Sequence, residues 1–281
     1  MCESESRAVG LIGNPVAHSL SPAFQQAAFD ACELPLRYEL WQTETDEIPE
    51  RLRRIRDGNA LGANVTVPHK EAVTTLMDDL SQTALRIGAV NTVIRNGASL
   101  IGDNTDAHGF IVPLREGSFE FDSSNAVIVG AGGAARAVVV ALLDAGIRSL
   151  AILNRNVERA RRLATQAGDT RVSAAPLSAL GDHVVAARLI VNATSVGWSG
   201  EPSPVELSLL ERAPRDAIAY DLTYRETAFL TTARAAGLAT IDGLPMLVHQ
   251  GARSFELWTG VNPPVNVMWE AAVLARAAKG D

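Results

Sequence analysis

Lys70 and Asp106 are the residues of this chain best suited to moving a proton. Lys70 ends the segment Asn64-Val-Thr-Val-Pro-His-Lys70, and Asp106 ends Gly102-Asp-Asn-Thr-Asp106. Reduction of a ketone places negative charge on its oxygen, so an enzyme that transfers hydride to a ketone needs a proton donor or a fixed positive charge there. A lysine held by a carboxylate in a partly desolvated cleft could supply either. In the oxidative direction its neutral amine would accept the hydroxyl proton.

Both residues also have an ordinary structural interpretation. Most lysines near the start of a helix are solvated, and Asp106 could cap the helix that begins before His108-Gly-Phe110. Lys70, however, follows the carboxyl end of a predicted strand, and open α/β sheets bind ligands at this edge. This position favours the catalytic interpretation.

A glycine-rich turn indicates a nucleotide site. Gly130, Gly132 and Ala135 fit the spacing G-x-G-x-x-G/A, between the apolar run 126–129 and a segment, 133–145, rich in Ala, Val and Leu. In this motif the first glycine permits a tight turn, the second lets the backbone approach a pyrophosphate, and the third small residue keeps the helix near the sheet. An ordinary tight turn would look the same locally. The order strand, turn, helix, ended by Gly146, favours the dinucleotide interpretation.

The end of the next predicted strand, 149–153, indicates which dinucleotide is bound. An acidic residue there would favour NAD, but Asn154 and Arg155 stand at this point and Arg159 follows four residues later. Two guanidinium groups on one helical face could fork onto a 2′-phosphate, so we predict NADP. Arg161 and Arg162 are expected to form a solvated helix face.

Composition favours a two-domain cytosolic protein that binds small molecules. The 281 residues exceed the usual span of one domain, and Cys2 and Cys32 form neither a disulfide framework nor a metal-ligand spacing. A net charge of −7 disfavours nucleic acid as a partner. The first residues lack a basic region followed by an apolar stretch, and no apolar run is long enough to cross a bilayer, so we expect neither export nor membrane insertion.

A bound metal is not expected. A zinc site needs several clustered Cys, His or carboxylate ligands. The histidines are scattered through the sequence, at His18, His69, His108, His183 and His249.

Apolar runs and their punctuation predict an α/β fold. Strands are expected at 9–13, 36–41 and 62–67, and helices at 47–56 and from Ser21, with Ser21 as N-cap and Pro22 at the first helical position. After the nucleotide segment, strands at 189–192, 217–222 and 239–241 continue a parallel pattern. Helices at 246–258 and 266–278 close the chain.

Seven segments resemble the successive motifs of the shikimate dehydrogenase family, in the family's order and over nearly the whole chain. They are Gly13-Asn-Pro-Val-Ala-His-Ser-Leu-Ser-Pro22, Asn64-Val-Thr-Val-Pro-His-Lys70, Gly88-Ala-Val-Asn-Thr92, Asp103-Asn-Thr-Asp106, Gly130-Ala-Gly-Gly-Ala-Ala-Arg136, Asn192-Ala-Thr-Ser195 and Asp242-Gly-Leu-Pro-Met-Leu-Val-His-Gln-Gly251. With the pattern of elements, the resemblance implies two domains separated by a cleft. These are an N-terminal α/β substrate domain, 1–105, and a Rossmann-like NADP-binding domain, 106–245, with C-terminal helices, 246–281, that pack back on the first.

The resemblance implies the NADPH-dependent, reversible reduction of 3-dehydroshikimate to shikimate, in aromatic amino-acid (chorismate) biosynthesis. Lys70 would be the catalytic acid and base, with Asp106 as its partner. Ser19, Ser21 and Tyr224 would hold the substrate carboxylate. The ring hydroxyls would be bound by Thr66, Asn91 and Gln250. The alternatives are that the two serines only cap a helix and that the two amides only satisfy buried backbone groups.

For the cofactor, the resemblance implies that the glycine-rich turn cradles the pyrophosphate, through Gly130, Ala131, Gly132, Gly133 and Ala134. Asn154, Arg155 and Arg159 would bind the adenosine phosphate end. The nicotinamide side would be lined by Thr194, Leu222, Gly243 and Met246. Without the resemblance, Leu222 and Met246 would be assigned to the core. Asn156 departs from the family pattern Asn-Arg-Thr, which removes one hydroxyl near the 2′-phosphate.

Two other functions remain open at this point. One is a catabolic quinate/shikimate dehydrogenase that could use NAD; an acidic residue in place of Asn154 or Arg155 would favour it. The other is a non-catalytic sensor of shikimate or nucleotide, against which the presence of both Lys70 and Asp106 argues. In each case we expect a cytoplasmic monomer or homodimer.

Overall fold

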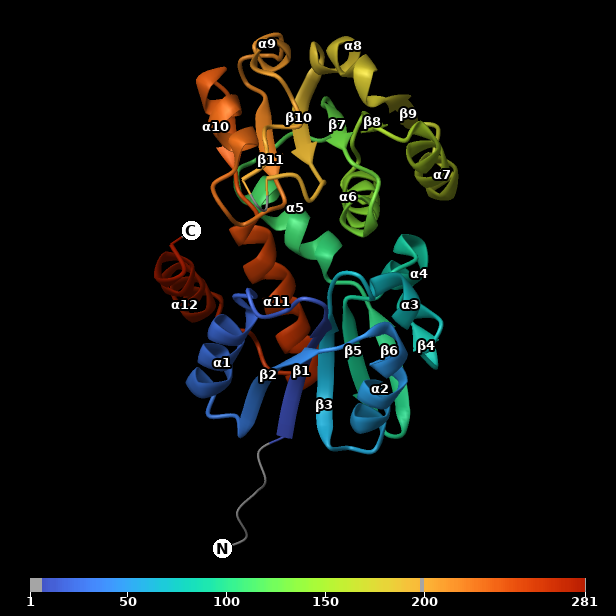
Figure 1. Ribbon diagram of the computed structural model, residues 1–281, viewed down its shortest axis with the longest axis vertical. Coiled ribbons are helices and arrows are strands. Elements are labelled where there is room, and N and C mark those ends of the chain that lie inside the picture. Colours follow the sequence, from blue (N-terminus) through green and yellow to red (C-terminus); the bar gives the residue numbers. More distant parts are fainter. Residues whose placement is uncertain (1–6, 198–199, 281) are drawn as a thin grey trace, which may run out of the picture. The chain divides into compact units, whose positions relative to one another are not determined.

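The computed structural model describes residues 7–197 and 200–280, which divide into two compact units. One unit holds the chain up to Gly109 and again from Leu247, and the other is Phe110–Met246. Each unit is built around its own sheet (Figure 1). The α/β class predicted from the sequence is confirmed.

The sheet of the first unit is mixed. Its strands are β1 (Arg7–Gly13), β2 (Leu36–Gln42), β3 (Ala60–Val65), β4 (Asp79–Leu80), β5 (Thr92–Asn96) and β6 (Ser99–Asp103). They lie in the order β2-β1-β3-β5-β6-β4. β1 is parallel to β2 and β3, whereas β5 is antiparallel to both β3 and β6. Strand β3 begins and ends two residues before the predicted 62–67, so Thr66 and Val67 lie in the loop before Lys70.

Helices of the first unit come from both ends of the chain. They are α1 (Ser21–Ala31), α2 (Ile48–Arg56), α3 (Lys70–Thr74), α4 (Gln82–Ile87) and α12 (Val265–Ala278), with most of α11 (Leu244–Thr259) and the start of α5 (Asp106–Glu116); η1 (Thr45–Glu47) is a short 3₁₀ helix. α1 and α12 pack side by side (Figure 1). In α11, Trp258 donates to the Val93 carbonyl oxygen at 3.0 Å and fastens this helix to β5.

The sheet of the second unit is parallel throughout. Its strands are β7 (Asn125–Val129), β8 (Ser149–Asn154), β9 (Val172–Pro176), β10 (Ala187–Asn192), β11 (Ile218–Asp221) and β12 (Ala239–Ile241). Their order, β12-β11-β10-β7-β8-β9, is that of a Rossmann fold. The helices are α6 (Gly133–Asp144), α7 (Val157–Ala167), α8 (Leu180–Val184), α9 (Leu207–Leu210) and α10 (Ala228–Ala235), with the 3₁₀ helix η2 (Leu177–Ala179).

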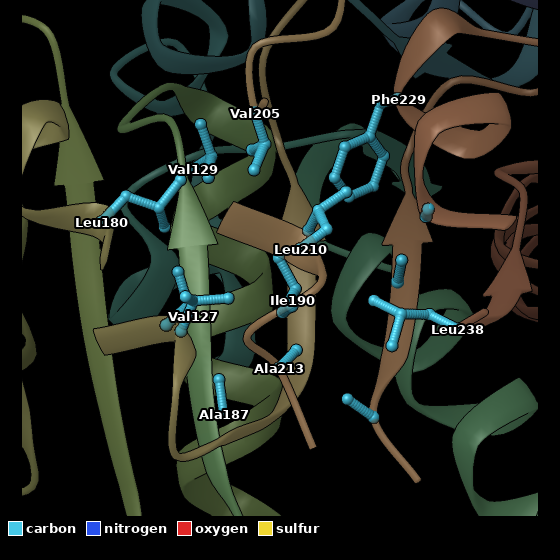
Figure 2. Packing of buried hydrophobic residues seen from close by; sticks show 14 of the residues in the cluster. Val127, Val129, Leu180, Ala187, Ile190, Val205, Leu210, Ala213, Phe229 and Leu238 are labelled. Carbon is cyan, nitrogen blue, oxygen red and sulfur yellow. The ribbon is translucent and has the colours of Figure 1, made fainter. Parts of the chain in front are cut away.

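One face of this parallel sheet packs against helices α8 to α10. Val127 and Val129 from β7 and Ile190 from β10 meet Leu210 and Phe229 from the helices (Figure 2). The alternate residues of β7, such as Ile128, are also buried, because both faces of the sheet are covered. Each large apolar side chain buried here contributes about 1.5–3 kcal/mol. Because side chains on both faces of the sheet are buried, its strands are uninterrupted runs of apolar residues.

Tyr220 is a polar exception in the core of the second unit. Its ring stacks on Phe110 with centroids 5.0 Å apart, and burial raises the pKa of its phenol. Among the described residues its hydroxyl has no hydrogen-bond partner. An unsatisfied buried hydroxyl costs about 1–3 kcal/mol, so Tyr220→Phe should raise the free energy of unfolding by about 1 kcal/mol. Urea unfolding of both proteins tests this, and a lower midpoint for the variant would contradict it.

Candidate active site

Lys70 and Asp106 form an ion pair in the first unit. The Lys70 Nζ lies 2.5 Å from Asp106 Oδ2, and their side chains are 18% and 7% exposed. Each is the first residue of its helix, α3 and α5 respectively. The pair is therefore held at two helix starts, with the amine still reachable and the carboxylate buried.

Asp106 is not the residue that accepts from the first helical N–H groups. The backbone N–H of Asp106 is itself accepted by the Asn104 side chain at 3.0 Å. Both carboxylate oxygens of Asp106 are used by side chains, Oδ2 by Lys70 and Oδ1 by Asn91 at 2.8 Å. The hydrogen bonds therefore favour the catalytic interpretation of Asp106 over a capping role, since Lys70 and Asn91 hold its carboxylate from two sides.

Asn91 joins two other predicted site residues, Asp106 and Gln250, and also contacts Thr105. Its amide nitrogen donates to Asp106 Oδ1, to Thr105 Oγ1 at 2.9 Å and, at a longer 3.3 Å, to Gln250 Oε1. Its oxygen accepts the backbone N–H of Thr105 at 2.8 Å. Asn91 therefore satisfies a buried backbone group, as its structural alternative requires, and it also holds the carboxylate of the ion pair.

Gln250 and Gly251 belong to α11 and bring that helix to the site. The Gln250 amide donates to the Leu247 carbonyl oxygen at 2.8 Å, so its oxygen faces Asn91. Gly251 follows at a close approach to α1, where Gln25 donates to its carbonyl at 2.9 Å. A Cβ at position 251 would lie 2.4 Å from the ring of Phe24.

Ser19 and Ser21 stand at the start of α1, but the predicted N-cap is wrong. Leu20 is the N-cap and Ser21 is the first helical residue, because the Ser19 hydroxyl already accepts the Ser21 N–H at 3.1 Å. Ser21 is buried, with 5% of its surface exposed. Thr66 lies in the loop between β3 and α3, and its N–H donates to the Ile12 carbonyl.

The glycine-rich turn of the second unit has the geometry that its motif requires. Gly130 has φ +114°, and a Cβ there would meet the Ala193 carbonyl at 2.9 Å. At Gly132 and Gly133 an added Cβ would meet nothing within 4 Å. Ala135, in the first turn of α6, is fully buried. Since α6 begins at Gly133, its first N–H groups have no acceptor within the helix.

The predicted arrangement of the two arginines that follow β8 is wrong in one respect. Arg155 precedes α7, whose N-cap is Asn156, so Arg155 and Arg159 do not share a helical face. Asn156 accepts the Glu158 N–H, which is a capping role. Arg161 pairs with Glu158 on the exposed surface, as expected of a solvated helix face.

Asp221 organises the loops that carry the remaining predicted cofactor residues. Its buried carboxylate accepts from Asn192, Thr227 and the Thr223 N–H, and burial raises its pKa against these hydrogen bonds. Asn192 in turn accepts the N–H and hydroxyl of Thr194.

Gly243 packs directly on the loop after β11. A Cβ at Gly243 would meet the Leu222 carbonyl oxygen at 2.2 Å, which only a glycine avoids. Met246 is 8% exposed, whereas Leu222 and Tyr224 are half-buried.

Within the described ranges 7–197 and 200–280, no group of three or more His, Cys, Asp or Glu side chains is arranged to hold a metal ion. The helices of the same ranges include none that is long and apolar enough to span a membrane.

Comparison with known proteins identifies the family. Models of the shikimate dehydrogenase substrate-binding domain, of shikimate/quinate 5-dehydrogenase and of the shikimate 5′-dehydrogenase C-terminal domain match residues 11–93, 114–199 and 243–273. A shikimate dehydrogenase (NADP⁺) of Symbiobacterium thermophilum is 42% identical, over 96% of this chain and 94% of that protein. The chain belongs to the shikimate dehydrogenase family. The resemblance carried by the seven motifs is therefore confirmed.

Solved members of the shikimate dehydrogenase family share the fold. The Thermus thermophilus shikimate 5-dehydrogenase in complex with NADP(H) and shikimate is 42% identical, with a TM-score of 0.86 over 96% of this chain and 99% of that one. A quinate dehydrogenase of Corynebacterium glutamicum in complex with NAD is 31% identical, with a TM-score of 0.87 over the same shares of the two chains.

The sequence missed the residues behind the ion pair. Asn64, Thr92, Thr105 and Ser254 are buried next to Asn91 and hydrogen-bonded to it or to one another. One signal was available, because Gln250 and Ser254 are four residues apart on one helix and so share a face.

Proposed function

We infer that this protein is a shikimate dehydrogenase, which reduces 3-dehydroshikimate to shikimate reversibly with NADPH in aromatic amino-acid (chorismate) biosynthesis. The observation that carries this inference is the partly exposed Lys70 side chain held by the buried Asp106 carboxylate, in a member of this family. A fixed amine of this kind fits proton transfer to a carbonyl oxygen.

In this proposal Lys70 transfers the proton, and Asp106 holds the Lys70 side chain in position. During reduction a proton passes from the Lys70 Nζ to the carbonyl oxygen, while NADPH, when bound, supplies the hydride that goes to the carbonyl carbon. In the reverse direction the neutral amine takes the proton of the hydroxyl. The Asp106 carboxylate, 2.5 Å from the Nζ, holds the amine in place.

We assign the substrate contacts by polarity and position. Ser19 and Ser21, beside the N-terminus of α1, are proposed to hold the carboxylate, which the helix dipole favours. Thr66, Asn91 and Gln250 are proposed to bind the ring hydroxyls. Tyr224, from the second unit, would add a contact to the carboxylate. For Asn91 this role adds to its hydrogen bond with Asp106.

The residues of the second unit fit NADP. The open space at Gly132 and Gly133 supports a pyrophosphate bound by Gly130, Ala131, Gly132, Gly133 and Ala134. Arg155 and Arg159 are exposed, and with Asn154 they are proposed to bind the adenosine 2′-phosphate. Thr194, Leu222, Gly243 and Met246 are proposed to line the nicotinamide side.

Gly132→Ala should weaken cofactor binding while it leaves the stability of the fold nearly unchanged. Because the new methyl group would meet no protein atom within 4 Å, the free energy of unfolding should fall by no more than about 1 kcal/mol. The methyl group would stand where the pyrophosphate approaches, so the KM for NADP should rise about ten-fold while the KM for shikimate stays constant. Steady-state kinetics with each substrate varied tests this, and an unchanged KM for NADP would count against the assigned turn.

We further propose domain limits and a setting for the enzyme. The substrate domain is assigned to 1–105, the NADP-binding domain to 106–245 and the closing helices to 246–281. A cytoplasmic monomer or homodimer is proposed, in line with the composition.

One assay tests the whole proposal. The purified protein is given shikimate or quinate with NADP or NAD, and nicotinamide absorbance is followed in the four combinations. We expect the highest kcat/KM with shikimate and NADP. A preference for quinate and NAD would instead indicate the catabolic enzyme, and no turnover in any combination would indicate a binding protein.

A further inference from the structure

A buried polar cluster lies behind Asn91, on the side away from the Lys70 ion pair. We call it the hydroxyl cluster. It consists of Asn64 from β3, Thr92 from β5, Thr105 before α5 and Ser254 from α11. The exposed fractions of the four residues are between 0% and 5%. The proposed mechanism uses none of them.

Ser254 is the centre of the hydroxyl cluster. Its Oγ accepts from Asn64 Nδ2 at 3.0 Å and lies 2.8 Å and 3.1 Å from the hydroxyls of Thr92 and Thr105. It donates its one hydrogen to the Gln250 carbonyl oxygen at 3.0 Å. A hydroxyl has one hydrogen and two lone pairs, so this hydroxyl is fully used.

Thr105 links Ser254 to Asn91, and Thr92 hydrogen-bonds to the same Asn91 amide. Thr92 donates to Asn91 Oδ1 at 2.8 Å, and Thr105 Oγ1 accepts from Asn91 Nδ2. The backbone N–H of Thr105 can only donate, so it fixes which end of the Asn91 amide is the oxygen. The amide nitrogen is thereby turned toward Asp106 Oδ1.

We propose that Ser254 is a positioning residue of the active site, which acts through Thr105 and Asn91 to hold the Asp106 carboxylate in place for Lys70. This inference rests on the proposed function and adds a residue to it. Without the Ser254 hydroxyl, a hydrogen of Asn64 and one threonine hydroxyl lose their buried acceptor. The Thr105 hydroxyl, which accepts from the Asn91 amide, can then turn and shift that amide, and small displacements of a catalytic group lower the rate strongly.

The test compares Ser254→Ala with Ser254→Thr, which retains the hydroxyl, and with Thr259→Ala as a matched control. Thr259 lies on the same helix and also donates to a carbonyl four residues earlier, at 2.8 Å, but it lies outside the hydroxyl cluster. We expect Ser254→Ala to lower kcat about ten-fold with less than about a two-fold change in the KM for shikimate. Ser254→Thr should recover most of kcat, and Thr259→Ala should leave it unchanged.

A second readout is independent of turnover. Of the 25 lysine and arginine residues, Lys70 and Lys279 are the only lysines. Protein labelled with ¹³C at the lysine Cε therefore gives two side-chain signals, and Lys279 serves as an internal reference. In Ser254→Ala the Lys70 signal should move from its wild-type position while the Lys279 signal stays.

The outcomes separate the two proposals. If wild-type protein turns over shikimate but Ser254→Ala matches it in kcat and in the Lys70 signal, Ser254 is only part of the core and the inference is overturned. Equal losses in Ser254→Ala and Thr259→Ala would overturn it as well. If wild-type protein has no activity, the proposed function fails, and the Lys70 signal alone decides whether Ser254 positions the ion pair.

Discussion

Lys70→Ala should lower kcat by about three orders of magnitude, because general acid–base catalysis contributes roughly 10²–10⁴-fold. The Asp106 carboxylate would remain in place with Asn91 as its donor, so the substrate-binding side chains should keep their positions. We therefore expect the dissociation constant for shikimate to stay within a few-fold of the wild-type value. Turnover and equilibrium binding, measured on the same preparations, test the two parts separately.

Two further variants sharpen the test of Lys70. Lys70→Arg keeps a positive charge next to Asp106 but cannot lose its proton, so it should remain as inactive as Lys70→Ala if proton transfer is the role. Activity close to wild type in Lys70→Arg would mean that a fixed charge suffices. Lys279→Ala changes the other lysine, which is exposed and donates to the Ser19 carbonyl, and it should keep normal turnover. A Lys70→Ala enzyme of near-normal rate would remove the assignment altogether.

Replacing Arg155 and Arg159 together with glutamine should raise the KM for NADP by about 100-fold. Hydrogen bonds to charged groups contribute about 1.5–3 kcal/mol each, and a 2′-phosphate would lose two charged donors. NAD has no 2′-phosphate, so its KM should change little, and the preference for NADP should largely disappear.

Arg161→Gln with Arg162→Gln is the matched control for the arginine pair. It removes the same charge from the same part of the chain, but Arg161 is engaged with Glu158 at the surface. Its KM for NADP should stay within about two-fold of wild type, since surface charges at this distance are largely screened. A similar rise in the KM for NADP in both double variants would show that net charge is responsible, and an equal rise for NADP and NAD would rule out recognition of the 2′-phosphate.

The nucleotide half of the fold could be predicted from the sequence because its signals are local. The apolar run 126–129, the glycines that follow and Gly146 mark strand, turn and helix end, and the structure has them as β7, the turn and α6. Strand β9 was missed because it pairs with one neighbour only, and Val172 and its neighbours are partly exposed and weakly apolar.

In the first unit, the antiparallel hairpin of β5 and β6 was missed for a different reason. An expectation of alternating strands and helices hid the turn signal Asn96-Gly97, where Gly97 has φ +62°. The error at Ser21 was smaller, since the hydroxyl of Ser19 rather than that of Ser21 accepts the helix N–H.

In the candidate site, too, some residues could be predicted from the sequence and others could not. Lys70 and Asp106 stand out by residue type and position, whereas the hydroxyl cluster joins residues up to 190 positions apart through single hydroxyls. Ser254 follows Arg253 and precedes Phe255 on a helix, and nothing in its type or spacing marks it as more than an ordinary small core residue. Such a role is visible only once the chain has folded.

Gly251 has a consequence for reading related sequences. The missing side chain lets α11 lie against Phe24 of α1, and α11 carries both Gln250 and Ser254. A relative with alanine or a larger residue at this place would have to move the aromatic ring at the Phe24 position, replace it with a smaller side chain, or separate the two helices. The smallest residue in the chain is thus a marker, readable in any new homologue, for whether that protein preserves the same spacing between its first and its penultimate helix.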